Sequence, residues 1–205
     1  MKALRKATPG FGLVVAEVAE PSPGPDEVLV EVHAAGICGS DLHVYEWTPS
    51  YEWMAPLMPV TLGHEFSGTV VARGPGVEAP AEGMRVTVWP SYAGGTCAYC
   101  RAGIKEHCAC RKTVGLRQDG GFARFVRVPA KQCITLPEGL DFDIAALSEP
   151  LAVGANAVHV SGLGPGENVV ILGPGPIGLA VLRFAKLAGC SDVTVMGFDD
   201  EVRLT

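Results

Sequence analysis

Three residues of different chemistry stand in short stretches of this chain that contain glycine or proline. Cys38 lies in GICGSDLH, His64 in GHEFSG and Glu149 in SEPLAVG. A thiolate, an imidazole and a carboxylate are all ligands that zinc accepts, and a catalytic zinc site keeps three protein ligands and one open position. The three residues therefore predict a catalytic zinc site that forms only in the folded chain. Taken singly, each residue also has an ordinary interpretation, as a small buried thiol or a satisfied polar side chain.

The stretches around these residues resemble the zinc-dependent medium-chain alcohol dehydrogenases, in particular the branch that holds threonine and sorbitol (polyol) dehydrogenases. The resemblance runs from Met1 to Thr205 and also rests on a cysteine cluster near Cys97 and on GPGPIG at 173–178. The EPLAVG run is more like the polyol enzymes, whereas segment 47–59 is more like the threonine enzymes. The resemblance therefore implies a secondary alcohol as substrate, either a polyol or a hydroxy amino acid, and does not decide between the two.

The resemblance gives roles to the neighbours of the zinc ligands. Zinc acts as a Lewis acid toward the alcohol oxygen in such sites. Asp41 accepts the free N–H of His64, which fixes the imidazole tautomer and raises its basicity. Glu65 lies behind the metal or replaces Glu149 as a ligand during turnover. Both acids have an alternative interpretation as ordinary surface charges.

A proton path is also implied by the resemblance. The hydroxyl of Ser40 can accept and donate a proton in turn, and His43 is the nearest group that titrates near neutral pH. The path runs from the alcohol to Ser40, across the cofactor ribose, and through His43 to solvent. The alternative is that the two residues only cap or decorate a turn.

A second cluster holds Cys97, Cys100, Cys108 and Cys110 in one short loop. The relatives bind a structural zinc here with the pattern C-x2-C-x2-C-x7-C, and the last three positions match Cys97, Cys100 and Cys108. The first position is Gly94, which has no side chain, although a structural zinc site requires four ligands. Either Cys110 or an outside group supplies the fourth ligand, or the metal is absent or weakly held.

The glycine motif at 173–178 follows an apolar run and opens a helical pattern, which is the context of a dinucleotide-binding turn. Gly173 allows the tight turn, Gly175 lets the backbone approach a pyrophosphate, and Gly178 lets the helix pack on the strand. Pro176 and Ile177 complete the turn at the helix N-terminus, where free N–H groups attract phosphate.

An acidic residue for the ribose of NAD is expected about 20 positions after this motif. That slot falls on Gly197, and the nearest acid is Asp199, followed by two more acids. The acids would repel the 2′-phosphate of NADP, so the sequence favours NAD, and NADP is not excluded.

The first 140 residues or so are predicted to form short strands separated by Gly- and Pro-rich turns, the pattern of a closed or partly closed β-barrel. The expected strands are 2–7, 13–18, 27–33, 66–72, 85–89 and 122–128. The resemblance implies a GroES-like barrel that carries the catalytic residues, with a domain over 1–150.

Helix, strand and glycine turn alternate in the remainder. Helical segments are expected at 144–147, 151–158 and 177–188, and buried strands at 169–172 and 193–196. The result is a two-domain α/β protein in which 151–205 is the first part of a Rossmann doubly wound sheet. Such a sheet needs about six strands, so the chain looks like the front portion of a longer protein.

Composition narrows the functional classes. A net charge of −6 does not favour nucleic acid or an anionic membrane as partner. No apolar run approaches the roughly 20 residues that span a bilayer, and seven cysteines without a secretory signal favour metal ligands or reduced thiols. We therefore expect a cytoplasmic enzyme with a small-molecule alcohol substrate, and the resemblance implies a homodimer or homotetramer. Two alternatives are a zinc-free quinone reductase on the same scaffold and a catalytically silent fragment that serves as an interaction module.

Overall fold

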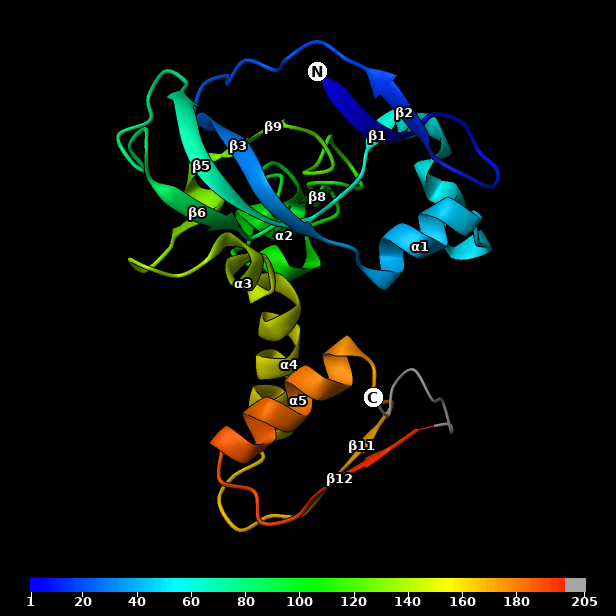
Figure 1. Cartoon of the computed structure of the whole chain (residues 1–205), viewed down its shortest axis with the longest axis vertical. Coiled ribbons are helices and arrows are strands. Elements are labelled where there is room, and N and C mark those ends of the chain that lie inside the picture. Colours follow the sequence, from blue (N-terminus) through cyan, green and yellow to red (C-terminus); the bar gives the residue numbers. More distant parts are fainter. Residues whose placement is uncertain (198–205) are drawn as a thin grey trace. The chain divides into compact units, whose positions relative to one another are not determined.

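The computed structural model describes residues 1–197, and Figure 1 shows the order of the elements along the chain. The chain divides into two compact units, Met1–Leu147 and Ser148–Thr205. Cys38 and His64, which are predicted to bind a metal, lie in the first unit, and the glycine turn lies in the second.

Two antiparallel sheets form the first unit. One has the strand order β10-β6-β5-β3-β9 and the other β2-β1-β4. The strands are β1 (Lys2–Lys6), β2 (Val14–Glu17), β3 (Glu27–Gly36), β4 (Val60–Thr61), β5 (Glu65–Arg73), β6 (Arg85–Val88), β9 (Phe125–Pro129) and β10 (Cys133–Thr135). An isolated bridge between Ala3 and Ala123 joins the two sheets. The unit is therefore a partly closed barrel, as the sequence predicted.

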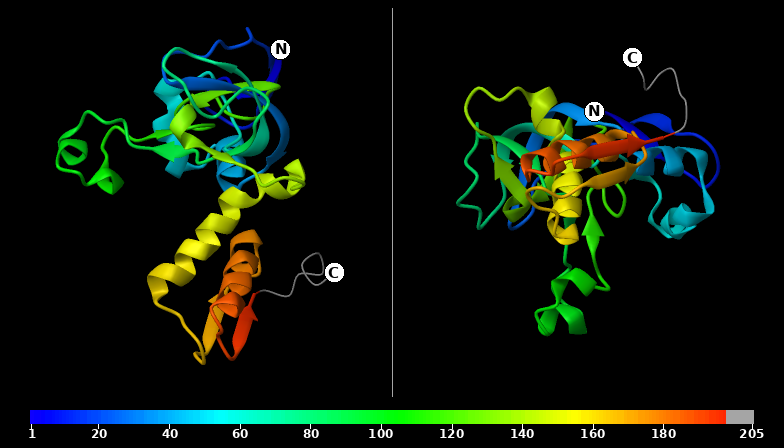
Figure 2. Two further views of the ribbon diagram at one scale, coloured as in Figure 1. Left: turned by 90° about the vertical axis from the view of Figure 1, so that its left-hand side faces the viewer. Right: turned by 90° about the horizontal axis from the view of Figure 1, so that it is seen from below.

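Short helices and one small ribbon connect these strands. The helices are α1 (Gly39–Glu46), η1 (Pro49–Leu57), α2 (Ala98–Arg101), η2 (Lys105–His107), η3 (Ala130–Gln132) and α3 (Phe142–Ala146). The ribbon pairs β7 (Ser91–Tyr92) with β8 (Lys112–Thr113). The segment between β7 and β8 projects from the barrel as a separate lobe, drawn in green in Figure 2.

The barrel core follows from the alternation of side chains along the strands. Val28 and Val30 of β3 are fully buried because they share one face of that strand. They pack with Phe66 and Val70 of β5, and with further buried valines of β6 and β9. Burial of each such side chain contributes roughly 1.5–3 kcal/mol, which makes this cluster the main support of the sheet.

A smaller cluster lies beneath the first helices of the unit. It consists of Val44, Met54, Val60 and Leu62, all nearly inaccessible to solvent. Val44 comes from α1 and Met54 from η1, so the cluster fixes both helices against the strand segment that ends before His64.

The second unit contains a strand–turn–helix–strand arrangement. Its elements are α4 (Ser148–Ser161), β11 (Val169–Leu172), α5 (Pro176–Leu187) and β12 (Val193–Met196). The two strands are parallel, with Val169 opposite Val193, and α5 crosses between them, which is the predicted βαβ unit. Helix α4 packs on α5.

The predicted α/β fold class is confirmed. The elements that were predicted differ from the expectation mainly in length, whereas several short elements were not predicted, namely α1, β4, β7, α2, η2, β8, η3 and β10. Strand β3 continues to Gly36, three residues past its predicted end, and η1 was not predicted at all. The prolines at 49 and 56 conceal η1, because proline normally marks the beginning or end of a helix rather than its course. The domain boundary at 150 stays a prediction.

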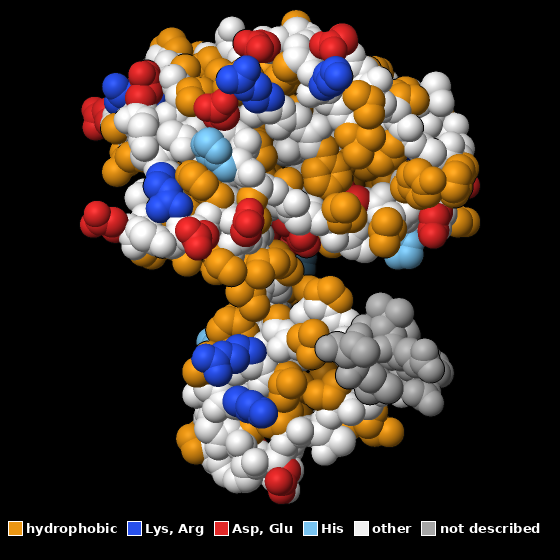
Figure 3. All heavy atoms as spheres, viewed as in Figure 1, with side chains coloured by type: hydrophobic (Ala, Val, Ile, Leu, Met, Phe, Trp, Pro, Cys, Tyr) orange, Lys and Arg blue, Asp and Glu red, His pale blue; other side chains and the backbone are white. Residues whose placement is uncertain are grey.

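The surface and the helices add two observations. Acidic and basic side chains are interspersed on the face of the first unit shown in Figure 3. Within residues 1–197, no helix combines the length and the apolar character needed to cross a membrane.

Candidate functional site

Pairing of β3 with β5 brings the predicted zinc ligands of the first unit together. Gly36, the last residue of β3, stands opposite Glu65, the first residue of β5. Cys38 follows β3 by two residues and His64 immediately precedes β5, so both lie at the same end of the paired strands. A Cβ atom on Gly36 would lie 2.4 Å from a carboxylate oxygen of Glu65. The glycine therefore leaves room for that carboxylate.

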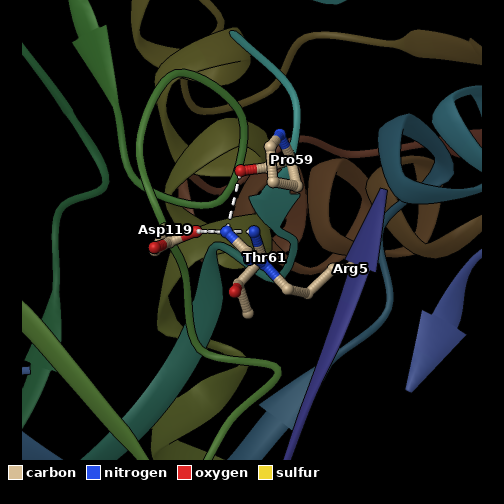
Figure 4. A network of polar contacts seen from close by, with 4 residues as sticks. All are labelled: Arg5, Pro59, Thr61 and Asp119. Carbon is tan, nitrogen blue, oxygen red and sulfur yellow. Dashed lines mark hydrogen bonds and ion pairs between the residues drawn. The ribbon is translucent and has the colours of Figure 1, made fainter. Parts of the chain in front are cut away.

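A polar network holds the segment that leads to His64. The Arg5 guanidinium donates to the Pro59 carbonyl at 2.7 Å and to the Asp119 carboxylate at 3.2 Å, and the Thr61 N–H donates to the same Asp119 oxygen at 2.7 Å (Figure 4). The network joins β1 and the loop at Asp119 to β4. It therefore positions the backbone three residues before His64.

Helix α1 begins directly after Cys38 and supplies its nearest polar neighbour. The Cys38 N–H donates to one Asp41 carboxylate oxygen at 2.9 Å, and the other oxygen lies 3.7 Å from Nδ1 of His64. Asp41 is only 2% exposed. The carboxylate thus lies near both the cysteine and the histidine, at a distance from Nδ1 longer than a direct hydrogen bond. The role of Asp41 in orienting His64 stays a prediction.

Cys38, His64 and Glu65 form a cluster of possible metal ligands, in which one ligand atom of each residue lies within 4.8 Å of the others. In a tetrahedral zinc site, bond lengths of about 2.0–2.3 Å separate the ligand atoms by about 3.3–3.8 Å. The 4.8 Å limit exceeds this separation by about 1.0–1.5 Å, so the three ligand atoms would approach one another by at most about that amount on binding a zinc ion. His64 and Glu65 are buried at 6% and 7% exposure, and a buried carboxylate requires a compensating charge or hydrogen bond. The donor set fits zinc.

The electrostatics of the cluster agree with this assignment. A hydrogen bond with His64 lowers the pKa of the Cys38 thiol, which favours the thiolate form that binds metal. Burial raises the pKa of the Asp41 carboxyl, whereas the charge of His64 and the Cys38 N–H act in the opposite direction.

The two predicted proton-transfer residues lie on α1. The Ser40 hydroxyl is 3.4 Å from Nε2 of His64, so it is adjacent to the cluster. His43 is exposed, and its ring stacks on Tyr51 of η1 with the centroids 5.8 Å apart. Burial raises the pKa of Tyr51, and a hydrogen bond with Ser40 opposes that shift. Tyr51 therefore joins the two residues into one polar group, a contact that the sequence did not predict because it depends on η1.

Glu149 belongs to the second unit, in the first turn of α4. Its role as a zinc ligand stays a prediction. The carboxylate that the first unit itself places with Cys38 and His64 is that of Glu65, which was expected to lie behind the metal or to replace Glu149 as a ligand during turnover.

The cysteine cluster in the projecting lobe is assembled, apart from one residue. Cys97 Sγ lies 3.5 Å from Cys100 Sγ and 3.9 Å from Cys108 Sγ. A hydrogen bond from the backbone N–H of Cys100 is the main reason why the pKa of the Cys97 thiol is lowered to about 6. Cys110 is exposed and is not among the three clustered thiols.

The glycine motif lies between β11 and α5. Gly173 has a φ of +103° and its N–H donates to the Met196 carbonyl at 2.7 Å, which joins the turn to the end of β12. Gly175 is the N-cap of α5, and Pro176 occupies the first helical position. Ile177 is exposed. Asp199, the predicted ribose ligand, lies outside the described residues.

We predict that Asp41→Asn lowers zinc affinity by about 10–100-fold, because asparagine keeps an acceptor for the Cys38 N–H but loses the charge that orients His64. The measurement is competition for zinc with a chelating dye. Asp143→Asn is the control, since Asp143 is exposed on α3. Equal zinc affinities of the two variants would show that Asp41 does not support the metal site.

Gly178→Ala is expected to lower stability by about 1–3 kcal/mol and to weaken dinucleotide binding. An alanine Cβ would lie 1.8 Å from the Gly173 carbonyl oxygen, so the turn must shift. Gly175→Ala is the matched control: its Cβ meets nothing within 4 Å, so stability changes by less than about 1 kcal/mol. Because position 175 faces the pyrophosphate in the predicted site, this variant should still bind dinucleotide less tightly. Urea unfolding and fluorescence titration with NADH separate the two effects, and equal stability of both variants would contradict the prediction.

Comparisons with known proteins agree with this geometry. The alcohol dehydrogenase GroES-like domain family matches residues 24–138. The chain is 42% identical over 206 residues to a sorbitol dehydrogenase of Halalkalibacterium halodurans, covering 100% of the chain and 59% of that protein. It is 41% identical over 199 residues to an L-threonine 3-dehydrogenase of Pyrococcus horikoshii, covering 95% of the chain and 56% of that protein.

A solved structure extends the likeness to three dimensions. It is a short chain alcohol dehydrogenase from Escherichia coli CFT073 in complex with NADH, with a TM-score of 0.87 and 34% identity. The match covers 100% of the chain and 58% of that structure. The chain thus spans little more than half the length of the relatives it matches.

Proposed function

The chain belongs to the zinc-type medium-chain alcohol dehydrogenase family, and from this premise we propose that the whole protein oxidises a secondary alcohol to a ketone with NAD(P). The observation that carries the proposal is the meeting of Cys38, His64 and Glu65 within 4.8 Å. A zinc-free reductase on the same scaffold has no need for a thiol, an imidazole and a carboxylate at one point. The cluster therefore favours the zinc enzyme.

Cys38, His64 and Glu65 would hold the zinc, which when bound supplies a Lewis acid that polarises the substrate oxygen. Asp41 orients His64 through its carboxylate. Glu149 stays a predicted ligand that exchanges with Glu65. This division of roles explains why the site uses more carboxylates than a zinc ion with one open position requires.

Ser40 and His43 would move the substrate proton. The Ser40 hydroxyl lies beside His64 at 3.4 Å, where it can take the proton from the alcohol. His43 is exposed, so its imidazole can pass the proton to solvent. Tyr51 contacts both residues and keeps them in one group.

The turn from Gly173 to Gly178 would hold the dinucleotide pyrophosphate at the N-terminus of α5, where free N–H groups and the helix dipole favour negative charge. The bound nicotinamide would accept the hydride. A relative with NADH bound supports this cofactor class, and we propose NAD ahead of NADP because of Asp199 and the acids that follow it.

The substrate class rests on the relatives, which are named sorbitol dehydrogenase and L-threonine 3-dehydrogenase. We propose a polyol or a hydroxy amino acid. A homodimer or homotetramer and a cytoplasmic location stay predictions, and native mass spectrometry of the full-length protein measures subunit number and zinc content together.

The test is an activity screen on the full-length, zinc-loaded protein with polyols and L-threonine, each with NAD and with NADP. We expect formation of reduced nicotinamide with one substrate class, loss of activity with a chelator, and recovery when zinc is returned. Turnover that persists after complete zinc removal would contradict the proposal. So would a protein that binds zinc and cofactor but oxidises no alcohol of either class.

A further inference from the structure

The lobe between β7 and β8 contains three thiols in the geometry of a four-ligand metal site. In a tetrahedral zinc site with bonds of about 2.3 Å, two sulfur atoms lie about 3.8 Å apart. Cys97 Sγ lies 3.5 Å from Cys100 Sγ and 3.9 Å from Cys108 Sγ, close to that separation. The Sγ atoms of Cys100 and Cys108 lie within 4.8 Å of each other, so the three thiols are close to three corners of such a tetrahedron, and a fourth sulfur would complete it.

Residue 94 cannot supply the fourth ligand, because it is glycine. Its backbone nevertheless lies beside the cluster, since the Gly94 N–H donates to Cys108 Sγ at 3.3 Å. A Cβ atom built on Gly94 would lie 2.4 Å from the carbonyl oxygen of Cys110 and 3.0 Å from its Cβ. The main chain at Cys110 therefore occupies the space that a side chain at position 94 would need.

This packing places the Cβ atom of Cys110 near the position that a ligand at residue 94 would occupy. The Cys110 Cβ lies within 3.0 Å of the position from which a ligand at residue 94 would extend. The Cys110 side chain is exposed, so rotation between staggered rotamers is not blocked by a packed core. The Cys110 sulfur is not among the three clustered thiols, so a rotation toward them is what the proposal requires.

We propose that Cys110 is the fourth ligand of a zinc site formed with Cys97, Cys100 and Cys108, so that the ligand lost at Gly94 is replaced from the opposite side of the loop. A zinc ion held by four thiolates is the closed arrangement of a structural site. It would join the two ends of a lobe whose own residues are mostly exposed. The proposal does not depend on the reaction proposed above, and its test does not measure activity.

The first experiment labels thiols in the unaltered full-length protein. The zinc-loaded and the chelator-treated protein are each exposed to N-ethylmaleimide, and the rate at each cysteine is read by peptide mass spectrometry. We expect zinc to slow labelling of Cys110 at least about tenfold, together with Cys97, Cys100 and Cys108, because a metal-bound thiolate is withdrawn from reaction. Cys110 labelled at one rate in both samples would overturn the proposal, whether or not the other three are protected.

The second experiment counts sulfur ligands. Cobalt replaces zinc, and the intensity of the thiolate-to-cobalt absorption is compared between Cys110→Ser and Cys190→Ser. Cys190 lies in the second unit, with its Sγ 3.7 Å from the Gly164 carbonyl, so its replacement leaves the lobe unchanged. Cys38 contributes equally in both variants.

We expect Cys110→Ser to lose about one quarter of the thiolate-to-cobalt absorption that comes from the lobe, because one of four thiolates is removed. We also expect the zinc-loaded Cys110→Ser variant to release zinc to a chelator faster than the Cys190→Ser variant does. Identical spectra and release rates in the two variants would overturn the proposal. If Cys110→Ser does not fold, the labelling of the unaltered protein decides alone.

Discussion

Cys38→Ser is expected to empty the barrel metal site and to lower kcat/KM for the alcohol by at least about a thousandfold. Polarisation of the substrate oxygen by a metal contributes several kcal/mol to the transition state, and about 4 kcal/mol corresponds to a thousandfold in rate. A serine hydroxyl keeps the size of the side chain but is a far weaker zinc ligand than a thiolate. The measurements are zinc content after dialysis and steady-state kinetics on the full-length protein.

The matched control for this variant is Cys133→Ala in the same unit. Burial raises the pKa of the Cys133 thiol to about 12, and among the described residues Cys133 belongs to neither cluster of possible metal ligands. We expect its replacement to leave zinc content and kcat/KM within a small factor of the unaltered protein. A Cys38→Ser protein that retains both its zinc and its rate would remove the basis of the proposed function.

Cys38 and His64 could be proposed as zinc ligands from the sequence because each lies in a stretch with a distinctive local pattern. Cys38 and His64 stand beside glycines that permit turns, and the resemblance of both stretches pointed to one chemistry. The barrel strands could also be predicted from the sequence, since alternating apolar residues and the Gly or Pro residues between strands are local signals. The βαβ unit around Gly173 to Gly178 was predicted for the same reason.

The position of Glu65, the third candidate ligand of the first unit, depends on a contact that is remote in sequence. Whether Glu65 points toward Cys38 or away from it depends on the register of β5 against β3, because a slip of one residue turns every side chain to the other face. The register places Glu65 opposite Gly36. The sequence analysis ended that strand at residue 33 and so did not contain the pair. The contact between Tyr51 and His43 likewise could not be predicted from the sequence, because it depends on η1, which was not expected.

Glu65→Gln is expected to lower zinc affinity by more than about 100-fold, whereas Glu149→Gln lowers it by about 10–100-fold. Second-sphere groups typically account for 10–100-fold in metal affinity, and a direct ligand for more. Glu65 is the carboxylate that lies within 4.8 Å of the ligand atoms of Cys38 and His64. Its replacement by a neutral amide also leaves a buried polar group with a weaker partner.

The comparison is decisive because both variants remove one negative charge, so a difference between them reports geometry rather than net charge. Glu82→Gln is the control: Glu82 is 57% exposed and faces Arg73 at the surface, where an ion pair contributes little. Zinc affinity from dye competition and kcat/KM are measured for all three. If Glu149→Gln has the larger effect on both quantities, Glu149 is the permanent ligand, as the sequence first indicated, and Glu65 acts behind the metal. If Glu65→Gln has the larger effect, the carboxylate next to His64 completes the site within a single unit, and Glu149 serves the exchange of ligands during turnover.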